Sequence, residues 1–235
     1  MDNPGNTGWK QGEINMSEFT TEQRLERVEA YIAISNVMGK YVFHRMNENL
    51  PAVTALFTGR EDLRVEMPSG IYTGPDAAYR CFEVDHAVDP NADPTLVIHD
   101  INTPVIEIAA DCNTARGIWI SPGLATAAMP TGKKGLWAWV KYDCDFIRED
   151  AGWKIWHMRK YEIFTVPTDK SWTDENPMAM MAPPKAVDGA VAAPPPKALR
   201  SNDLPAGIST KYNPKKRVPA IPVPPEPYET WIENE

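Results

Sequence analysis

The stretch YDCDFIREDAGWKIWHMR, residues 142–159, carries the pattern that decides the fold. Its first half alternates, with the apolar residues Tyr142, Cys144 and Phe146 separated by single aspartates. Successive side chains of a strand point to opposite faces, so the alternation predicts a strand with one apolar and one charged face. The turn at residues 150–152 leads into a second apolar segment, which predicts an antiparallel hairpin.

Other segments of the chain also carry strand signals. They are rich in β-branched and aromatic residues and are separated by turn residues. They cover residues 62–67, 71–73, 96–109, 114–127, 134–149 and 153–166.

Three segments carry helix signals instead. Thr20 and Gln23 have the spacing of a capping box, and apolar residues recur at helical spacing from there to Met46. Pro51 suits the first turn of a short second helix, and Gly74-Pro75 opens a third that reaches about residue 88. The order of elements predicts an α+β fold, in which three helices pack on one face of a curved antiparallel sheet.

The polar first residues and the proline-rich last part divide the chain into three parts. Residues 1–19 are a predicted polar N-terminal arm, residues 20–166 hold the α+β domain, and residues 167–235 are a predicted extended Pro-rich C-terminal arm. Such an arm has no core of its own and must bury its apolar residues elsewhere, among them Val218, Ile221, Val223, Tyr228 and Trp231. We expect it to contact a neighbouring subunit of a homo-oligomer; the alternative is an arm folded back on its own domain.

Composition excludes several classes of partner. The formal net charge of -8 argues against nucleic acid and anionic membrane surfaces, which need a basic face. No apolar run reaches ~20 residues, so we expect no membrane span, and the first residues lack the pattern of a signal peptide. The three cysteines form no CxxC pair, and no HxH or HExxH motif occurs. We therefore expect a cytoplasmic protein without a metal site.

Three blocks in order resemble the SnoaL-like branch of the nuclear-transport-factor-2-like superfamily. They are KYVFHRMNENLPAVTALF at residues 40–57, HDINTPVIEIAADCNTA at residues 99–115 and the opening stretch at residues 142–159. The resemblance covers roughly residues 20–165. It implies a cone-shaped sheet whose helices enclose an apolar pocket. In similar enzymes such pockets host proton transfer or elimination on carbocyclic or aromatic molecules without a cofactor, and the enzymes assemble as dimers or trimers. For this chain we favour a trimer.

Two residues match catalytic positions of the family. His99 corresponds to the catalytic histidine of the second block, where an imidazole can act as base or acid near neutral pH. Tyr41 corresponds to a tyrosine that similar dehydratases aim into the pocket, where its phenol can bind a substrate oxygen. Each also has a structural alternative: His99 as a histidine at a strand end that hydrogen-bonds to the backbone, and Tyr41 as a tyrosine of the core. Asp100 follows His99 directly, so on a regular strand it points away and is read as a surface carboxylate.

The chain departs from the family where similar dehydratases carry an aspartate that orients the histidine. That position is Met46, so the usual His–Asp dyad is absent. His44 lies three residues after Tyr41 and can point to the same side of the helix, which makes it a third catalytic candidate.

Four residues are candidates for substrate binding: Met46, Trp119, Tyr142 and Cys144. The third block has Cys144 where the family has an acidic residue, and its aspartate neighbours are expected on the other face. A nucleophilic role for the thiol would need an adjacent base. Aromatic residues on the long strands suit a flat aromatic ligand. His86 and His157 have no motif support, and we expect structural roles for both.

Together these features predict a cofactor-independent lyase with His99 and Tyr41 in its site. The substrate would be an aromatic or polycyclic small molecule, such as a lignin-derived diaryl compound, that loses water or formaldehyde. One alternative is an isomerase or cyclase of a steroid-like or polyketide-like substrate. Another is a non-catalytic ligand-binding or assembly protein of the same fold.

Overall fold

The structure is a computed structural model that describes residues 19–87, 96–129, 132–174, 201–206, 211–215 and 219–231. Helical segments are α1 (Thr21–Met46), α2 (Leu50–Thr54), α3 (Ala77–Tyr79) and a π-helical turn (Arg80–Val84). The strands are β1 (Arg64–Met67), β2 (Gly70–Thr73), β3 (Val97–His99), β4 (Asn102–Ile108), β5 (Thr114–Met129), β6 (Gly132–Glu149) and β7 (Gly152–Pro167). The α+β fold is confirmed, and the predicted third helix is shorter than expected.

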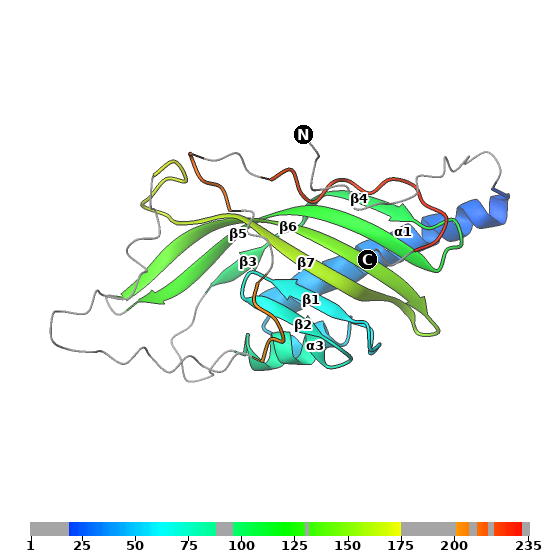
Figure 1. Ribbon diagram of the computed structural model, residues 1–235, viewed down its shortest axis with the longest axis horizontal. Coiled ribbons are helices and arrows are strands. Elements are labelled where there is room, and N and C mark those ends of the chain that lie inside the picture. Colours follow the sequence, from blue (N-terminus) through cyan, green and yellow to red (C-terminus); the bar gives the residue numbers. More distant parts are fainter. Residues whose placement is uncertain are drawn as a thin grey trace.

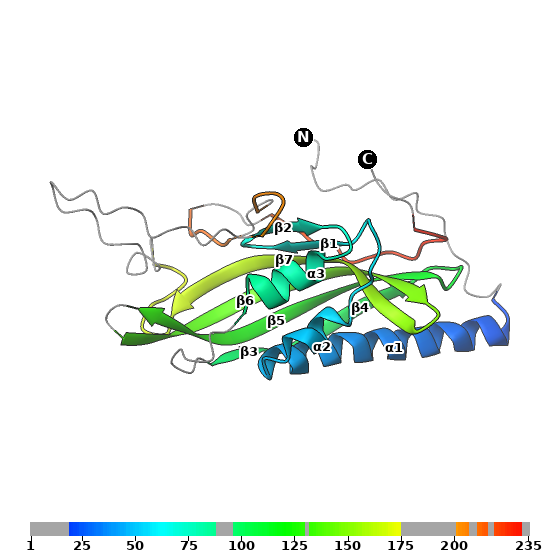
Figure 2. The ribbon, with the colours of Figure 1, turned by 90° about the horizontal axis from the view of Figure 1, so that it is seen from below.

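Helix α1 begins at the predicted capping box. The Thr20 side chain accepts a hydrogen bond from the Gln23 backbone at 3.2 Å, and the Gln23 side chain accepts one from the Thr20 backbone at 2.9 Å. The buried residues Ile34, Met38 and Tyr41 then recur at helical spacing and pack into the core. Helix α1 therefore runs along one face of the sheet, which we call the inner face (Figure 2).

The sheet has the strand order β2-β1-β7-β6-β5-β3, and β4 also pairs with β5. The long strands β5, β6 and β7 are antiparallel neighbours and curve together (Figure 1). One expectation is wrong: β1 pairs with β7 in parallel, so the sheet is mixed rather than antiparallel. Local alternation identifies strands but carries no information about the direction of a partner that is distant in sequence.

The expected strand over residues 96–109 is also interrupted, because Asp100 and Ile101 lie between β3 and β4. Pro122 of β5 faces this break and accepts a hydrogen bond from the Asp100 backbone at 3.2 Å. Proline has no N–H to return to the ladder, so pairing weakens at this point. As expected, Asp100 is exposed.

Alternation along β6 sorts its side chains as predicted. Tyr142, Cys144 and Phe146 are buried in the core cluster with α1, and the intervening Asp143 and Asp145 lie on the opposite, outer face. These aspartates are not solvated, because each is only 2% exposed. Their charges are balanced by nearby cationic side chains: Arg116, Arg159 and, when protonated, His157.

The described parts of the C-terminal arm contact their own domain. Residues 219–231 lie across the outer face, on the opposite side of the sheet from α1 (Figure 2). Tyr228 is 6% exposed, and its backbone carbonyl accepts a hydrogen bond from Ala110 at 3.0 Å. The ring of Trp231 lies 4.2 Å from that of Trp156.

These segments follow the alternative of an arm folded back on its own domain. Ile221 is partly buried and Val223 is 53% exposed, whereas Val218 lies outside the described residues. A contact with a neighbouring subunit stays a prediction.

No helix among the described residues is long and apolar enough to cross a membrane.

The buried Tyr228 gives a test of the arm. We expect Tyr228→Ala to lower the free energy of unfolding by about 3 kcal/mol, because a large buried ring leaves a cavity. Tyr212→Ala is the matched control: this tyrosine of the arm is 37% exposed, and we expect a loss below about 1 kcal/mol. Urea denaturation of both variants measures the difference. Equal stabilities would show that the arm does not pack on the sheet as described.

Candidate active site

Strand register places a set of polar and aromatic side chains on the inner face. Tyr142 of β6 pairs with Trp119 of β5 and with Lys160 of β7, and directly paired residues share a face. Ser121 lies on the same face, because it is two positions after Trp119 on β5. His99 of β3 continues this surface, since its partner Gly123 is two residues beyond Ser121.

Aromatic rings form the buried floor of this site. Tyr41 is 3% exposed, and its ring centroid lies 5.8 Å from that of Tyr142, 5.9 Å from that of Phe82 and 6.5 Å from that of Phe57. Burial, followed by the influence of Tyr142, raises the pKa of the Tyr41 phenol well above its ordinary value. Tyr41 therefore stays protonated and can donate a hydrogen bond to an oxygen atom.

His99 is half-buried opposite Gly123. An added Cβ at Gly123 would lie 2.4 Å from the His99 Nδ1 atom and 2.6 Å from the Ile98 carbonyl oxygen, so only glycine leaves room for the imidazole here. Burial, with the charges of Lys160 and Arg45, lowers the pKa of His99 from 6.5 to about 3. Its imidazole is neutral at neutral pH and has a nitrogen able to accept a proton.

Two cations stand at the partly exposed side of the site. The Arg45 guanidinium lies 5.6 Å from the centre of the Phe82 ring, and the Lys160 ammonium lies 5.9 Å from the centre of the Tyr142 ring. Besides acting on His99, both charges add to the effect of burial in lowering the pKa of His86. Within the described ranges, neither cation forms an ion pair with a carboxylate.

Two buried polar atoms on the inner face have no hydrogen-bond partner among the described residues. They are the His99 Nδ1 atom and the Ser121 Oγ atom, and Ser121 is fully buried. Leaving such an atom unpaired costs about 1–3 kcal/mol, which a hydrogen-bonding ligand would offset. Sequence reasoning missed Ser121, Arg45 and Lys160. The strand register, which pairs Lys160 with Tyr142 and places Ser121 two positions after the Tyr142 partner Trp119 on the same face, would have identified these two residues.

The structure brings most of the sequence-derived candidates to the inner side. Trp119, Tyr142 and Cys144 are buried in the core, and Met46 is partly buried against it. Burial, with the nearby aspartates, raises the pKa of the Cys144 thiol well above its ordinary value, so it stays protonated and is a poor nucleophile.

His44 is partly buried, and no hydrogen bond joins it to His99 within the described residues. The α1 side chain whose charge acts on His99 is the next residue, Arg45. A role for His44 stays a prediction.

A histidine–aspartate pair does occur, but on the outer face. The His157 Nδ1 atom lies 2.9 Å from an Asp145 carboxylate oxygen, and its Nε2 atom lies 3.1 Å from the Asp62 carbonyl oxygen. The rings of Trp156 and Trp231 lie 4.4 Å and 5.5 Å from the imidazole. Both nitrogens are therefore occupied, which fits the structural role expected for His157.

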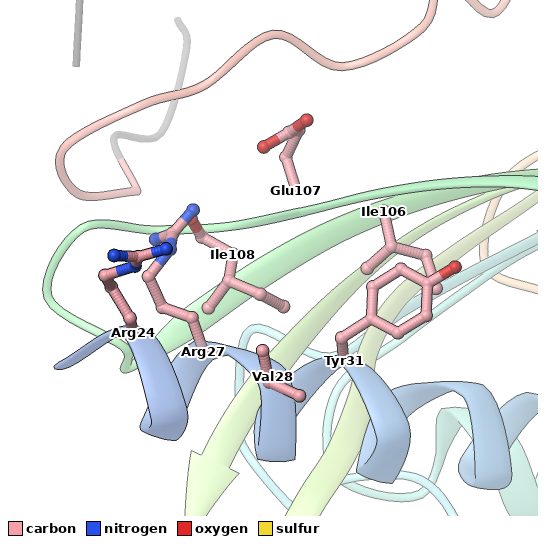
Figure 3. A pocket seen from close by; sticks show the side chains of 7 residues that line it. All are labelled: Arg24, Arg27, Val28, Tyr31, Ile106, Glu107 and Ile108. Carbon is pink, nitrogen blue, oxygen red and sulfur yellow. The ribbon is translucent and has the colours of Figure 1, made fainter. Parts of the chain in front are cut away.

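A groove of about 360 Å³ lies at another place, between α1 and β4 (Figure 3). Arg27 crosses it and donates hydrogen bonds to the Ile108 and Ala109 carbonyl oxygens at 2.6 and 2.8 Å. None of the catalytic candidates lines this groove.

The described residues hold no group of three or more His, Cys, Asp and Glu placed to bind a metal ion.

Comparison with solved structures identifies the fold as that of nuclear-transport-factor-2-like proteins. Hexachlorocyclohexane dehydrochlorinase LinA-type3 of Novosphingobium barchaimii aligns at a TM-score of 0.50 with 17% identity, covering 63% of this chain and 96% of that chain. A candidate dehydratase of the NTF2-like family from Streptomyces avermitilis aligns at a TM-score of 0.50 with 11% identity, covering 59% of this chain and 99% of that chain.

A family model for the SnoaL-like domain matches residues 26–159, which is more than half of the chain. The chain therefore belongs to the SnoaL-like domain family, as its three sequence blocks predicted. Among curated proteins, no sequence matches it.

The contact between His99 and Gly123 gives a second test. We expect Gly123→Ala to displace the imidazole and disturb the β3–β5 pairing, lowering the free energy of unfolding by about 1–3 kcal/mol. Gly39→Ala is the control, because an added Cβ there meets nothing within 4 Å and alanine favours a helix. Thermal denaturation and the NMR shifts of His99 measure both effects. An unchanged His99 environment in Gly123→Ala would contradict this geometry.

Proposed function

We propose that this chain is a cofactor-independent lyase acting on an aromatic or polycyclic small molecule, such as a lignin-derived diaryl compound. The observation that carries the proposal is a neutral His99, whose Nδ1 atom has no hydrogen-bond partner among the described residues, on the same inner face as a floor of aromatic rings. The dehydrochlorinase and the candidate dehydratase that share the fold are named for eliminations, which supports the same reaction class here.

The chemistry follows from the charge states of two residues. Neutral His99 removes a proton from the substrate, and the electron pair left behind forms the new double bond as the leaving group departs. The imidazolium then formed is a strong acid, because burial and two nearby cations disfavour it. It returns the proton to the departing hydroxyl as water. Where the leaving fragment is formaldehyde, His99 takes the proton of the hydroxyl that becomes its carbonyl, and the carbon–carbon bond to that group breaks. The carbon left behind, which holds the electron pair of the broken bond, takes the proton back from the imidazolium.

Tyr41 serves as a hydrogen-bond donor in this scheme. Its raised pKa keeps the phenol protonated, and its place on the floor suits a substrate oxygen such as a carbonyl or leaving hydroxyl. Aromatic neighbours surround it and offer edge and face contacts to a flat ligand. His44 is retained as a third catalytic candidate. We also still predict a homo-oligomer, with a trimer favoured, and a cytoplasmic location.

An isomerase or cyclase would use the same residues, because proton removal by a neutral imidazole begins either reaction. The two classes differ in product mass, since isomerisation loses no fragment. The absent His–Asp dyad puts an ordinary family dehydratase in doubt and favours a different elimination, because the described charges that act on His99 are the cations Lys160 and Arg45.

A panel of lignin-derived diaryl diols, assayed by mass spectrometry, tests the proposal. We expect loss of water or formaldehyde with the full-length protein and a fall in kcat of about 10²–10⁴-fold in His99→Gln. Asp100→Asn is the matched control, because this neighbouring side chain is exposed, and we expect unchanged turnover. A product of unchanged mass would indicate the isomerase. Full turnover by His99→Gln would remove His99 from the reaction.

A further inference from the structure

We infer that Arg45 and Lys160 bind an anionic oxygen group, such as the carboxylate of an aromatic acid, beside His99. The inference rests on the proposed function and adds the class of substrate: an aromatic molecule that carries a negative charge. Its basis is the position of two cations over the aromatic floor of the site, where neither forms an ion pair with a carboxylate of the described residues.

The two cations come from different elements and act on the same groups. Arg45 lies in the last turn of α1, and Lys160 lies on β7 opposite Tyr142. Both act electrostatically on His99, His86 and Cys81. The Phe82 ring under Arg45 and the Tyr142 ring under Lys160 both lie against Tyr41, at 5.9 and 5.8 Å between ring centroids, so the two cations stand over neighbouring rings. Like charges placed in this way repel, and an anion between them would relieve the repulsion.

The carboxylate of Asp85, which acts on two of these side chains, is already engaged in hydrogen bonds. Asp85 acts on Cys81 and His86, and its oxygens accept hydrogen bonds from the Tyr72 hydroxyl at 2.8 Å and from the Ser201 backbone at 2.9 Å. It forms no ion pair with Arg45 or Lys160 within the described residues. The positive charge at the site is therefore balanced by a ring face on each side and by solvent.

A second, independent observation points to a ligand. Ser121 is fully buried on the inner face, and its Oγ atom has no partner among the described residues. The hydroxyl lies two residues along β5 from the partner of His99, and it can donate a hydrogen bond to an oxygen ligand. Two cations and a hydroxyl donor make up the usual set for a carboxylate, and the aromatic floor suits the ring that carries it.

A bound anion would also serve the chemistry. Its charge would offset the two cations, so that imidazolium formation at His99 becomes less costly when substrate is present. Proton removal would then be favoured only after an anionic substrate has entered. A neutral molecule of the same shape would leave His99 a weak base.

Binding of benzoate and benzamide to the full-length protein tests this inference without requiring turnover. The two probes share a ring and nearly the same shape, but only benzoate is charged at pH 7. Isothermal titration calorimetry at low salt should show at least about tenfold tighter binding of benzoate, weakening as salt is added. Equal affinities in the unaltered protein would overturn the inference, whether or not any variant folds.

Two variants locate the anion. We expect Lys160→Gln and Arg45→Gln each to reduce the preference for benzoate by about tenfold or more. Lys40→Gln is the matched control, because it removes the same charge from an exposed position of α1, and the preference should persist. Thermal denaturation checks that each variant is folded. A preference for benzoate that survives both substitutions would place the anion elsewhere.

These outcomes are distinct from those for the lyase itself. Loss of turnover in His99→Gln tests the reaction, whereas the preference for benzoate over benzamide tests only the charge of the ligand. Selective benzoate binding without turnover of diaryl diols would retain the anion site and reject those substrates. Turnover of neutral diols without benzoate selectivity would retain the lyase and reject the anion site.

Discussion

Along β6, side chains alternate between two environments that differ in polarity, and both faces are buried. On the inner face, Tyr142 and Cys144 belong to the apolar core under α1. On the outer face, Asp143 and Asp145 are held by arginines and by His157 beneath the C-terminal segment. A shift of one residue in register would place carboxylates in the core, so the register of β6 with β5 and β7 is strongly specified. The position of every inner-face residue depends on it.

The same register separates the surroundings of two histidines in a family member that lacks the usual dyad. Its one described contact between histidine and aspartate side chains, His157 with Asp145, lies on the outer face and is fully engaged. On the inner face, the described charges that act on His99 are the cations Lys160 and Arg45. A carboxylate partner raises the basicity of an imidazole, whereas cations lower it, so the two arrangements suit different ligands. The cationic arrangement suits a ligand that brings its own negative charge.

Much of the fold could be read from the sequence because its signals are local. The capping box at Thr20, the alternation at residues 142–146 and the turn at residues 150–152 each depend on neighbours in the chain. The parallel pairing of β1 with β7 could not be read, since it joins segments about ninety residues apart. The break at Asp100 had a visible cause in Pro122, but it required knowing that β3 and β5 are neighbours.

The site was predictable only in part for the same reason. His99 and Tyr41 stand in recognisable blocks, whereas Lys160, Ser121 and Gly123 gain meaning only from cross-strand pairing. Lys160 looks in sequence like one charge among many, and its position opposite Tyr142 is what places it over the aromatic floor. A glycine opposite a histidine is likewise unremarkable until the close approach of the imidazole is seen.

Titration of the His99 imidazole by NMR tests the central claim, a histidine held neutral by burial and by two cations. His99→Gln assigns the signal. Because the pKa in the folded state lies below the ordinary value of 6.5, His99 should stay neutral between about pH 8 and pH 5. The folded state then binds fewer protons than the unfolded chain below about pH 6.5, so its stability should fall as acid is added. A His99 signal that titrates near pH 6.5 would contradict the claim.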